Sequence, residues 1–315
     1  MDGITISQSS TPLSRIGYGS CGSVWADSSQ FPDIDQCTTS TSIVLKRADG
    51  LPDRSIGNEA TIHKHILSSL GPYHINIPRH TAFLQPESST WNIILPRLPT
   101  GLRLHARCLL VEKFWNGPED MIDAIVDDGR NQHCLIRPYL GRRRTDTASS
   151  RRSMLKSISL RNYPLHIDQI GAVGLAAQSY ACAMAEGLAF LLWVAEIDAC
   201  DVEFVLARPR PVPDEDDASR SDASASFTFT SGPLGEHALW ILDFDCYKRL
   251  PMTGEGMKIA AERFWRNDPF YPNPNAKCEE DVALWEVFRG RFLETRAKML
   301  AGKDEAIRGV PSRKA

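Results

Sequence analysis

Residues 17–24 read GYGSCGSV and carry the pattern G-x-G-x-x-G-x-V. The pattern places Gly17, Gly19 and Gly22 around a tight turn and Val24 in the strand that follows it. Glycines at these positions let backbone N–H groups approach phosphate oxygens that side chains would obstruct. The pattern therefore predicts either a ligand-covering strand–turn–strand flap or an ordinary glycine hairpin, and the neighbouring segments help to choose between them.

The next two segments along the chain present a lysine and then a glutamate. Residues 43–46 (IVLK) predict a strand that ends in Lys46. Thirteen residues later Glu59 opens an amphipathic pattern that predicts a helix over residues 57–70. Each charge alone is more typical of a solvated surface. Their order after the glycine-rich stretch favours a paired site instead.

A third acidic position ends an apolar segment in the second half of the chain. Residues 239–243 (LWILD) predict a strand ending in Asp243, and FVL at 204–206, directly after Glu203, predicts its partner. The two acids are 40 residues apart, but 29 of these, Arg208–Glu236, form a low-complexity segment rich in Pro, Asp and Ser. The 11 that remain suit a hairpin, although Asp243 could also be a simple strand-end cap.

In this order the motifs resemble those of protein kinases. The resemblance implies an α+β, protein-kinase-like two-lobed fold with a small β-rich N-lobe and a larger helical C-lobe. It implies ATP binding by Gly17, Gly19, Gly22, Val24 and Lys46, with Glu59 paired to that lysine. The chain lacks an A-P-E motif after Asp245, so it is more similar to the aminoglycoside and choline kinase branch than to Ser/Thr kinases.

The segment that should carry the catalytic loop departs from the kinase pattern H-R-D-L-x-x-x-N. It reads EIDACDVEFVL at residues 196–206, so Glu-Ile precedes the first aspartate where His-Arg is expected. We predict Asp198 as the catalytic base, because Glu203 lies five residues beyond it, whereas five beyond Asp201 comes an apolar leucine. Asp243 and Glu203 would then hold Mg²⁺, with glutamate in place of the usual asparagine.

Composition limits the class of protein. The chain has 315 residues, a net charge of -3 and no apolar run long enough to span a membrane, so we expect no nucleic-acid or membrane partner. It opens without a secretory signal, which predicts a cytoplasmic or nuclear location. The linker-like stretches divide it into disordered tails at 1–14 and 302–315, an N-lobe at 15–112 and a C-lobe at 113–301 with a disordered insertion at 208–236.

Four longer strings resemble an uncharacterised fungal family, a domain of unknown function that is often labelled zinc finger protein. They are residues 134–144, 159–169, 197–206 and 267–272. The eight cysteines include no C-x-x-C pair and no matching histidine pair, so we expect no zinc site. This resemblance brings almost no function with it.

Two functional hypotheses follow. In the first, the chain transfers phosphate from ATP, with Mg²⁺, to a hydroxyl of a small molecule, using Asp198 and Lys46. In the second, it is an inactive pseudokinase that binds a nucleotide or a protein partner, consistent with the altered catalytic loop. The family resemblance also allows an accessory role in fungal secondary metabolism.

Overall fold

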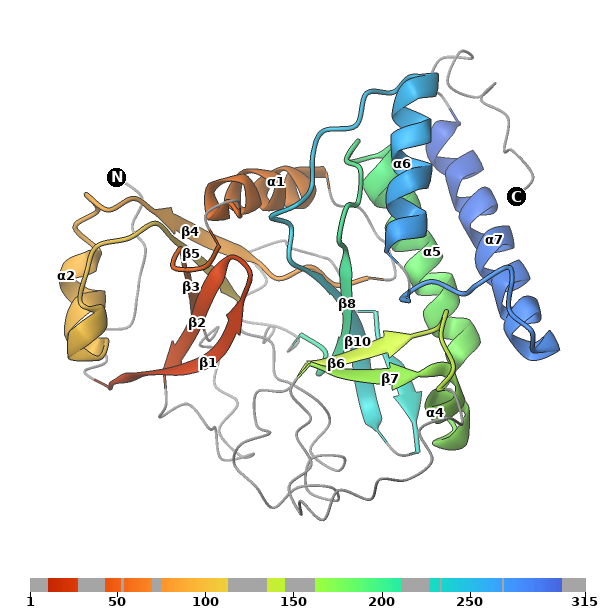
Figure 1. Ribbon diagram of the computed structural model, residues 1–315, viewed down its shortest axis with the longest axis horizontal. Helices are drawn as coiled ribbons and strands as arrows, with labels where there is room; N and C mark the ends of the chain where they lie inside the picture. Colours follow the sequence, from red (N-terminus) through yellow and green to blue (C-terminus); the bar gives the residue numbers. More distant parts are fainter. Residues whose placement is uncertain are drawn as a thin grey trace, which may run out of the picture.

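The computed structural model describes residues 11–27, 43–51, 54–69, 75–112, 135–144, 162–210, 227–232, 234–267 and 269–301. Within these ranges the chain forms two five-stranded sheets and six α-helices (Figure 1). The predicted α+β class is therefore confirmed. Residues 1–10 and 302–315 lie outside the described residues, whereas the first strand already begins at Leu13, inside the predicted tail.

The first sheet has the order β1-β2-β3-β5-β4, and all neighbouring strands are antiparallel. Its strands are β1 (Leu13–Gly19), β2 (Gly22–Asp27), β3 (Ile43–Arg47), β4 (His80–Leu84) and β5 (Cys108–Glu112). The two faces of the sheet are covered by different helices. Leu109 packs against α1 (Ile56–Ser69), and Leu110 packs in the cluster that includes α2 (Trp91–Ile94), because successive strand residues point to opposite faces.

The short β-branched run at residues 92–95 (NIIL) predicts a strand, and this prediction is wrong. Residues 91–94 form helix α2, which continues into the short 3-10 helix η1 (Leu95–Arg97) and is followed by η2 (Thr100–Leu102). Trp91 and Ile94 of α2 and Leu98, directly after η1, are buried in the core cluster of the first sheet. A short apolar run does not distinguish a strand from a helix by itself.

The second sheet has the order β7-β6-β8-β10-β9. Its strands are β6 (Ile136–Tyr139), β7 (Tyr163–His166), β8 (Glu203–Ala207), β9 (Phe229–Ser231) and β10 (Gly235–Leu242). The predicted hairpin is confirmed, because β8 and β10 pair antiparallel with Glu203 opposite Leu242. Strand β9 and the start of β10 fall within the segment predicted to be a disordered insertion, of which residues 211–226 and 233 lie outside the described residues.

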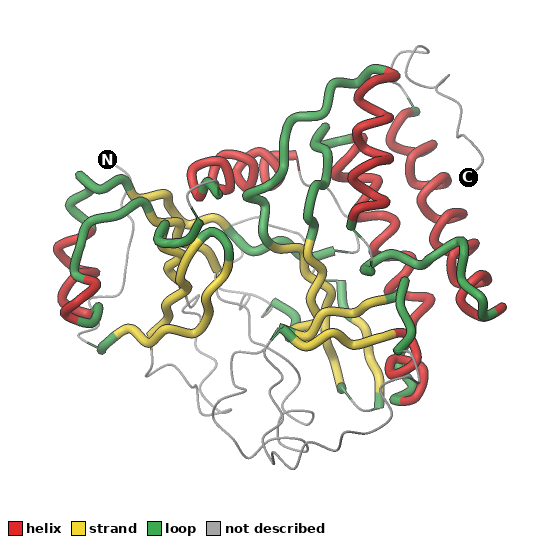
Figure 2. Tube along the Cα trace, viewed as in Figure 1, coloured by secondary structure: helices red, strands yellow, loops and turns green. Residues whose placement is uncertain are grey.

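The remaining helices gather on one side of the second sheet (Figures 1 and 2). They are α4 (Ile167–Ala172), α5 (Ala177–Trp193), α6 (Gly254–Arg266) and α7 (Glu279–Leu300). The apolar stretch at residues 168–197 predicts one long helix. This prediction is wrong, because Gly174 with φ +71 lies in a break between α4 and α5, and α5 ends at Trp193. None of the helices in the described ranges is long and apolar enough to cross a membrane.

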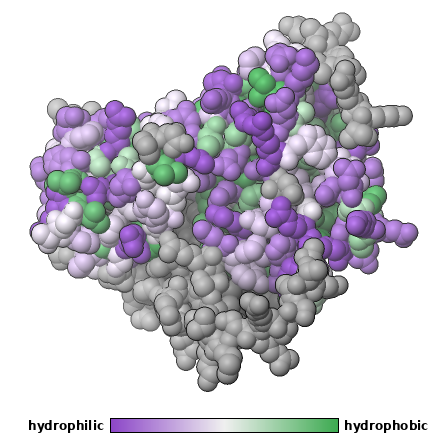
Figure 3. Space-filling view, in the orientation of Figure 1, coloured by the Kyte–Doolittle hydropathy of each residue, from purple (hydrophilic) through white to green (hydrophobic). Residues whose placement is uncertain are grey.

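Helix α1 joins the two halves of the molecule. Ile56 and Ala60 pack against the first sheet, whereas Ile62 and Ile66 belong to the large core formed with the second sheet and α5. On the face of the molecule seen in Figure 3, the described residues show hydrophobic colour in separate spots among hydrophilic residues.

His63 reinforces this junction from the buried side of α1. Its Nε2 lies 2.6 Å from the carbonyl oxygen of Pro78, and its ring packs 4.9 Å from the ring of Phe244, measured between centroids. Burial lowers the pKa of His63 to about 4, outweighing the hydrogen bond to Pro78. The imidazole is therefore neutral at neutral pH and donates its N–H to the carbonyl.

This burial predicts an acid-sensitive contribution to stability. Because the folded-state pKa of His63 lies below the ordinary value of 6.5, its contribution is fully present above pH 6.5 and is lost as the pH falls toward 4. The loss is about 3 kcal/mol for such a difference in pKa. Urea unfolding of wild type and His63→Gln between pH 4 and 8 should show the stability difference shrinking on acidification, and a constant difference would contradict the assignment.

Candidate functional site

Lys46, Glu59 and Asp243 meet between the two sheets. The Nζ of Lys46 lies 2.8 Å from Oε1 and 2.7 Å from Oε2 of Glu59, and 2.7 Å from Oδ1 of Asp243. We call these three residues the ion triad. Lys46 pairs across the sheet with Leu109, whose side chain packs on α1, so the same face directs the lysine toward Glu59. The predicted convergence of the three residues is confirmed, while their roles stay a prediction.

Burial and the neighbouring charges shift the pKa values of all three residues of the ion triad. Burial opposes the charged ammonium of Lys46, but Glu59 and Asp243 outweigh it and raise the pKa of the lysine above its ordinary value. Burial raises the pKa of Glu59 to about 7 against the opposing effect of Lys46. Burial also acts to raise the pKa of Asp243, but the lysine prevails and lowers it. Lys46 is thus a fixed cation between two acids.

The glycine-rich stretch forms a hairpin with its tip beside this triad. Gly17 pairs with Val24 and Gly19 with Gly22, which leaves a two-residue turn at Ser20 and Cys21. Cys21 is buried, and its electrostatic partners are Lys46, Glu59 and Asp245. Burial is the main cause that raises the pKa of its thiol. The tip of the hairpin therefore lies beside the ion triad.

The hairpin is also fastened to the segment after β3. The carboxylate of Asp49 accepts hydrogen bonds from the backbone N–H and the hydroxyl of Ser23 at 2.6 and 2.7 Å. The carbonyl of Ser20 accepts another from the N–H of Leu51 at 2.7 Å. Gly22 has φ +142, and a Cβ there would lie 1.8 Å from the carbonyl oxygen of Arg47. At Gly19 a Cβ would meet nothing within 4 Å, so that glycine faces open space.

Glu203, predicted as a metal ligand, is paired with an arginine. The Nη2 of Arg137 on β6 donates to Oε2 of Glu203 at 2.7 Å. Burial raises the pKa of Glu203 to about 7, and Arg137 opposes that effect. Glu203 lies opposite Leu242, the residue before Asp243, so the two predicted ligands are neighbours. The carboxylate of Asp243 is already paired with the Lys46 side chain, and that of Glu203 with the Arg137 side chain. These two carboxylates therefore do not fit Mg²⁺.

The carboxylate of Asp198 is buried and holds backbone N–H groups in place. Only 2% of the residue is exposed, and its Oδ1 accepts hydrogen bonds from the N–H groups of Lys248 at 2.9 Å and Cys200 at 3.3 Å. Its Oδ2 lies 3.6 Å from Nε of Arg263. In the described part of the chain no hydrogen bond or ion pair joins Asp198 to the ion triad. A general base must reach its substrate, and this carboxylate is occupied by the backbone instead.

Sequence reasoning missed a second ionic contact across the site. Arg54, just before α1, lies 2.9 Å from Oδ2 of Asp245 and 3.3 Å from Oδ2 of Asp201. The Nδ2 of Asn58 donates to the carbonyls of Asp245 and Tyr247 at 2.7 and 3.0 Å. Residues 243–245 read DFD where the kinase motif is D-F-G, and the extra aspartate was the available signal, because a carboxylate that is buried requires a cationic or N–H partner. Arg137 gave a similar signal as a charge within a short apolar strand.

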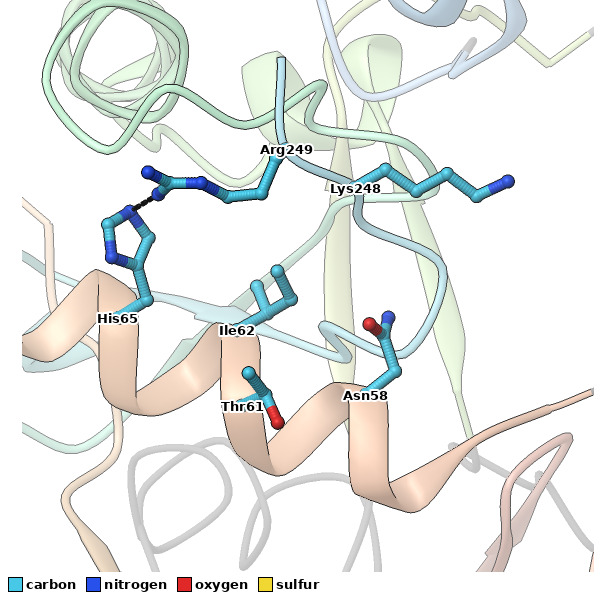
Figure 4. Close-up of a pocket in the computed structure, with 6 residues that line it drawn as sticks. All are labelled: Asn58, Thr61, Ile62, His65, Lys248 and Arg249. Carbon is cyan, nitrogen blue, oxygen red and sulfur yellow. Dashed lines mark hydrogen bonds between the residues drawn. The ribbon is translucent and has the colours of Figure 1, made fainter.

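A separate shallow pocket of about 440 Å³ lies between α1 and residues 248–249 (Figure 4). In Figure 4 Arg249 reaches toward His65, and the side chain of Lys248 extends in the other direction. His65 also contacts the carbonyl of Ala195, with 2.6 Å between Nε2 and the oxygen. None of the residues of the ion triad lines this pocket; it is lined by Asn58, Thr61, Ile62, His65, Lys248 and Arg249.

The close approach at Gly22 predicts a stability effect. Gly22→Ala should destabilise the protein by about 2 kcal/mol or more, because the added methyl group meets the Arg47 carbonyl and the backbone keeps a positive φ. Gly19→Ala is the matched control and should change the free energy of unfolding by less than about 0.5 kcal/mol. Urea unfolding measures both, and equal effects at the two glycines would contradict the fastened hairpin.

The placement of Asp198 predicts that its removal affects folding. Asp198→Ala should lower the free energy of unfolding by about 2–3 kcal/mol, since two backbone N–H groups lose a charged acceptor. Asp201, with its side chain 53% exposed, provides the control, and Asp201→Ala should cost less than about 1 kcal/mol. If Asp198→Ala left thermal and urea unfolding unchanged, the structural role would be refuted.

Comparison with known proteins finds a family similarity over part of the chain. Residues 239–304 match the model of a family of unknown function, DUF3669, described as zinc finger protein. A search of curated proteins finds no match. In the part of the chain that the structure describes, no group of three or more His, Cys, Asp or Glu is arranged to hold a metal ion. The segment containing Asp243, α6 and α7 is thus similar to this family, and of the four strings quoted for the resemblance only residues 267–272 lie inside the match.

Proposed function

We propose that the chain is a kinase-like module that binds a nucleotide without transferring its phosphate. The observation that carries the proposal is the ion triad beneath the glycine-rich hairpin. A fixed ammonium under a hairpin with an open glycine suits the phosphate groups of a nucleotide, which need a cation and nearby backbone N–H groups.

The arrangement of elements supports the kinase-like part of the proposal. A five-stranded antiparallel sheet carries the hairpin and Lys46, helix α1 supplies Glu59, and the β8–β10 hairpin ends at Asp243. In the proposal, residues 15–112 act as an N-lobe and residues 113–301 as a C-lobe, with the ligand between them. Gly17 and Val24 support the hairpin, and Gly19 lies where its backbone can approach a ligand.

The surroundings of Asp198 and Glu203 favour the inactive form over phosphotransfer to a small-molecule hydroxyl. Asp198 is buried and bonded to backbone N–H groups, so it is not available to accept a proton from a substrate. Glu203 is bound by Arg137 at 2.7 Å. The chain therefore keeps a cation for phosphate binding, while the groups expected to act in transfer are engaged elsewhere.

The proposal predicts ATP binding that depends on Lys46. Isothermal titration with ATP should give a measurable Kd for wild type, and Lys46→Met should weaken it tenfold or more, about 1.4 kcal/mol. Lys258→Met removes an exposed lysine of α6 and is the matched control, with affinity unchanged. Circular dichroism checks that each variant is folded. If Lys46→Met unfolds, Glu59→Gln is used in its place, because it changes a partner of Lys46 and leaves the lysine itself present.

Activity assays on the wild-type protein distinguish phosphotransfer from nucleotide binding alone. We expect no ATP hydrolysis above that of a buffer blank and no labelled phosphate on small-molecule hydroxyls from a cell extract. Turnover that disappears in Asp243→Ala would establish phosphotransfer instead. An absence of ATP binding by wild type would refute the nucleotide-binding module.

A further inference from the structure

We propose that the nucleotide binds this site without a divalent metal, with Arg137 and Lys46 supplying the positive charge that a metal would otherwise bring. The inference rests on the proposed function and specifies the form of its ligand, a nucleotide phosphate free of Mg²⁺. It is carried by two ion pairs, Lys46 with Asp243 and Arg137 with Glu203, each at 2.7 Å.

Arg137 is held in place by the second sheet. It lies on β6, next to Ile136, which pairs with Leu206 of β8, so the arginine stands beside the strand that begins at Glu203. The side chains of both partners are largely buried, with 19% of Arg137 and 22% of Glu203 exposed. A pair held by two neighbouring strands does not depend on a mobile surface side chain.

The same arginine acts on both acids. Glu203 lies opposite Leu242, so Asp243 follows directly in the hairpin. Lys46 is the main cation that favours the ionised form of Asp243 and lowers its pKa, followed by Arg54 and then Arg137. A metal bound by the two carboxylates would have to separate Lys46 from Asp243 and Arg137 from Glu203. Lys46 and Arg137 would then lie beside the metal ion without their carboxylate partners, and the three positive charges would repel one another.

Arg137 also has donors to spare. A guanidinium carries five N–H donors in one plane, and Nη2 is the atom that donates to Glu203. Nε of Arg137 is buried and has no hydrogen-bond partner within the described residues. Arginine binds phosphate oxygens through paired N–H groups, so it can hold Glu203 and a phosphate together. Lys46 presents its charge from the opposite sheet.

Titration of ATP in excess EDTA and in excess Mg²⁺ tests the inference. We expect the two Kd values to agree within about a factor of two to three, well short of the tenfold change that corresponds to about 1.4 kcal/mol. Binding that is tenfold or more tighter with Mg²⁺ would overturn the inference and leave the nucleotide-binding proposal standing. Binding in neither condition would refute both, so the two failures are distinguishable.

Substitution of the arginine provides a second test. Arg137→Gln should weaken binding in EDTA tenfold or more. Mg²⁺ should partly restore it, because Glu203 then has no cationic partner and a metal has to displace only Lys46 from Asp243. Arg289→Gln removes an exposed arginine of α7 and should leave both Kd values unchanged. Unaltered binding by a folded Arg137→Gln protein would overturn the role of Arg137.

Metal binding can also be observed directly. Electron paramagnetic resonance of Mn²⁺ should show the free ion in the presence of wild-type protein and a bound fraction with Arg137→Gln. Bound Mn²⁺ on the wild type, displaced by Mg²⁺ and lost in Asp243→Asn, would overturn the inference. If Arg137→Gln does not fold, the wild-type titrations in EDTA and Mg²⁺ decide the matter without it.

Discussion

The ammonium of Lys46 is the charge on which the arrangement of this protein depends. An ammonium group placed between two sheets is tolerated only with acidic partners close by, because burial penalises its charged form. Glu59 and Asp243 meet that requirement from α1 and from the end of β10. The position of one lysine thus constrains a strand of the first sheet, the bridging helix and a strand of the second sheet at once.

Helix α1 converts this local constraint into a connection between two cores. Its Ile56 belongs to the cluster with β5, and its Ile66 to the large core with α5. Asn58 and Arg54 hold the segment after Asp243, while the buried His63 donates to the carbonyl of Pro78. Apolar packing and polar contacts therefore act on the same helix, and a shift of α1 would disturb all of them together.

Sequence patterns predicted most of the local elements, and the order of the motifs also predicted the meeting of Lys46 with Glu59 and Asp243, but other non-local contacts were missed. The glycine hairpin, β3, α1 and the β8–β10 pair were found because spacing and periodicity report turns, strands and helical faces directly. Strands β6 and β7 were missed, since IRPY and YPLH are short and each contains proline. The pairing of Arg137 with Glu203 and the burial of Asp198 arise from strands and loops distant in sequence, which no single window reveals.

If a phosphate group takes up Lys46, it competes with one of the acids already there. The side chain of Glu59 is 7% exposed and that of Asp243 is 32% exposed, so the aspartate is the partner that water can solvate more readily when the contact is released. Asp243 also has φ +64, a left-handed backbone conformation that costs a non-glycine residue free energy. In the proposed complex, the contact of Lys46 with Asp243 would therefore weaken while Lys46 stays on α1, and Arg137 would still favour the ionised form of Asp243 without a metal. Ligand occupancy and the relative placement of the two sheets would then be coupled through one ion pair.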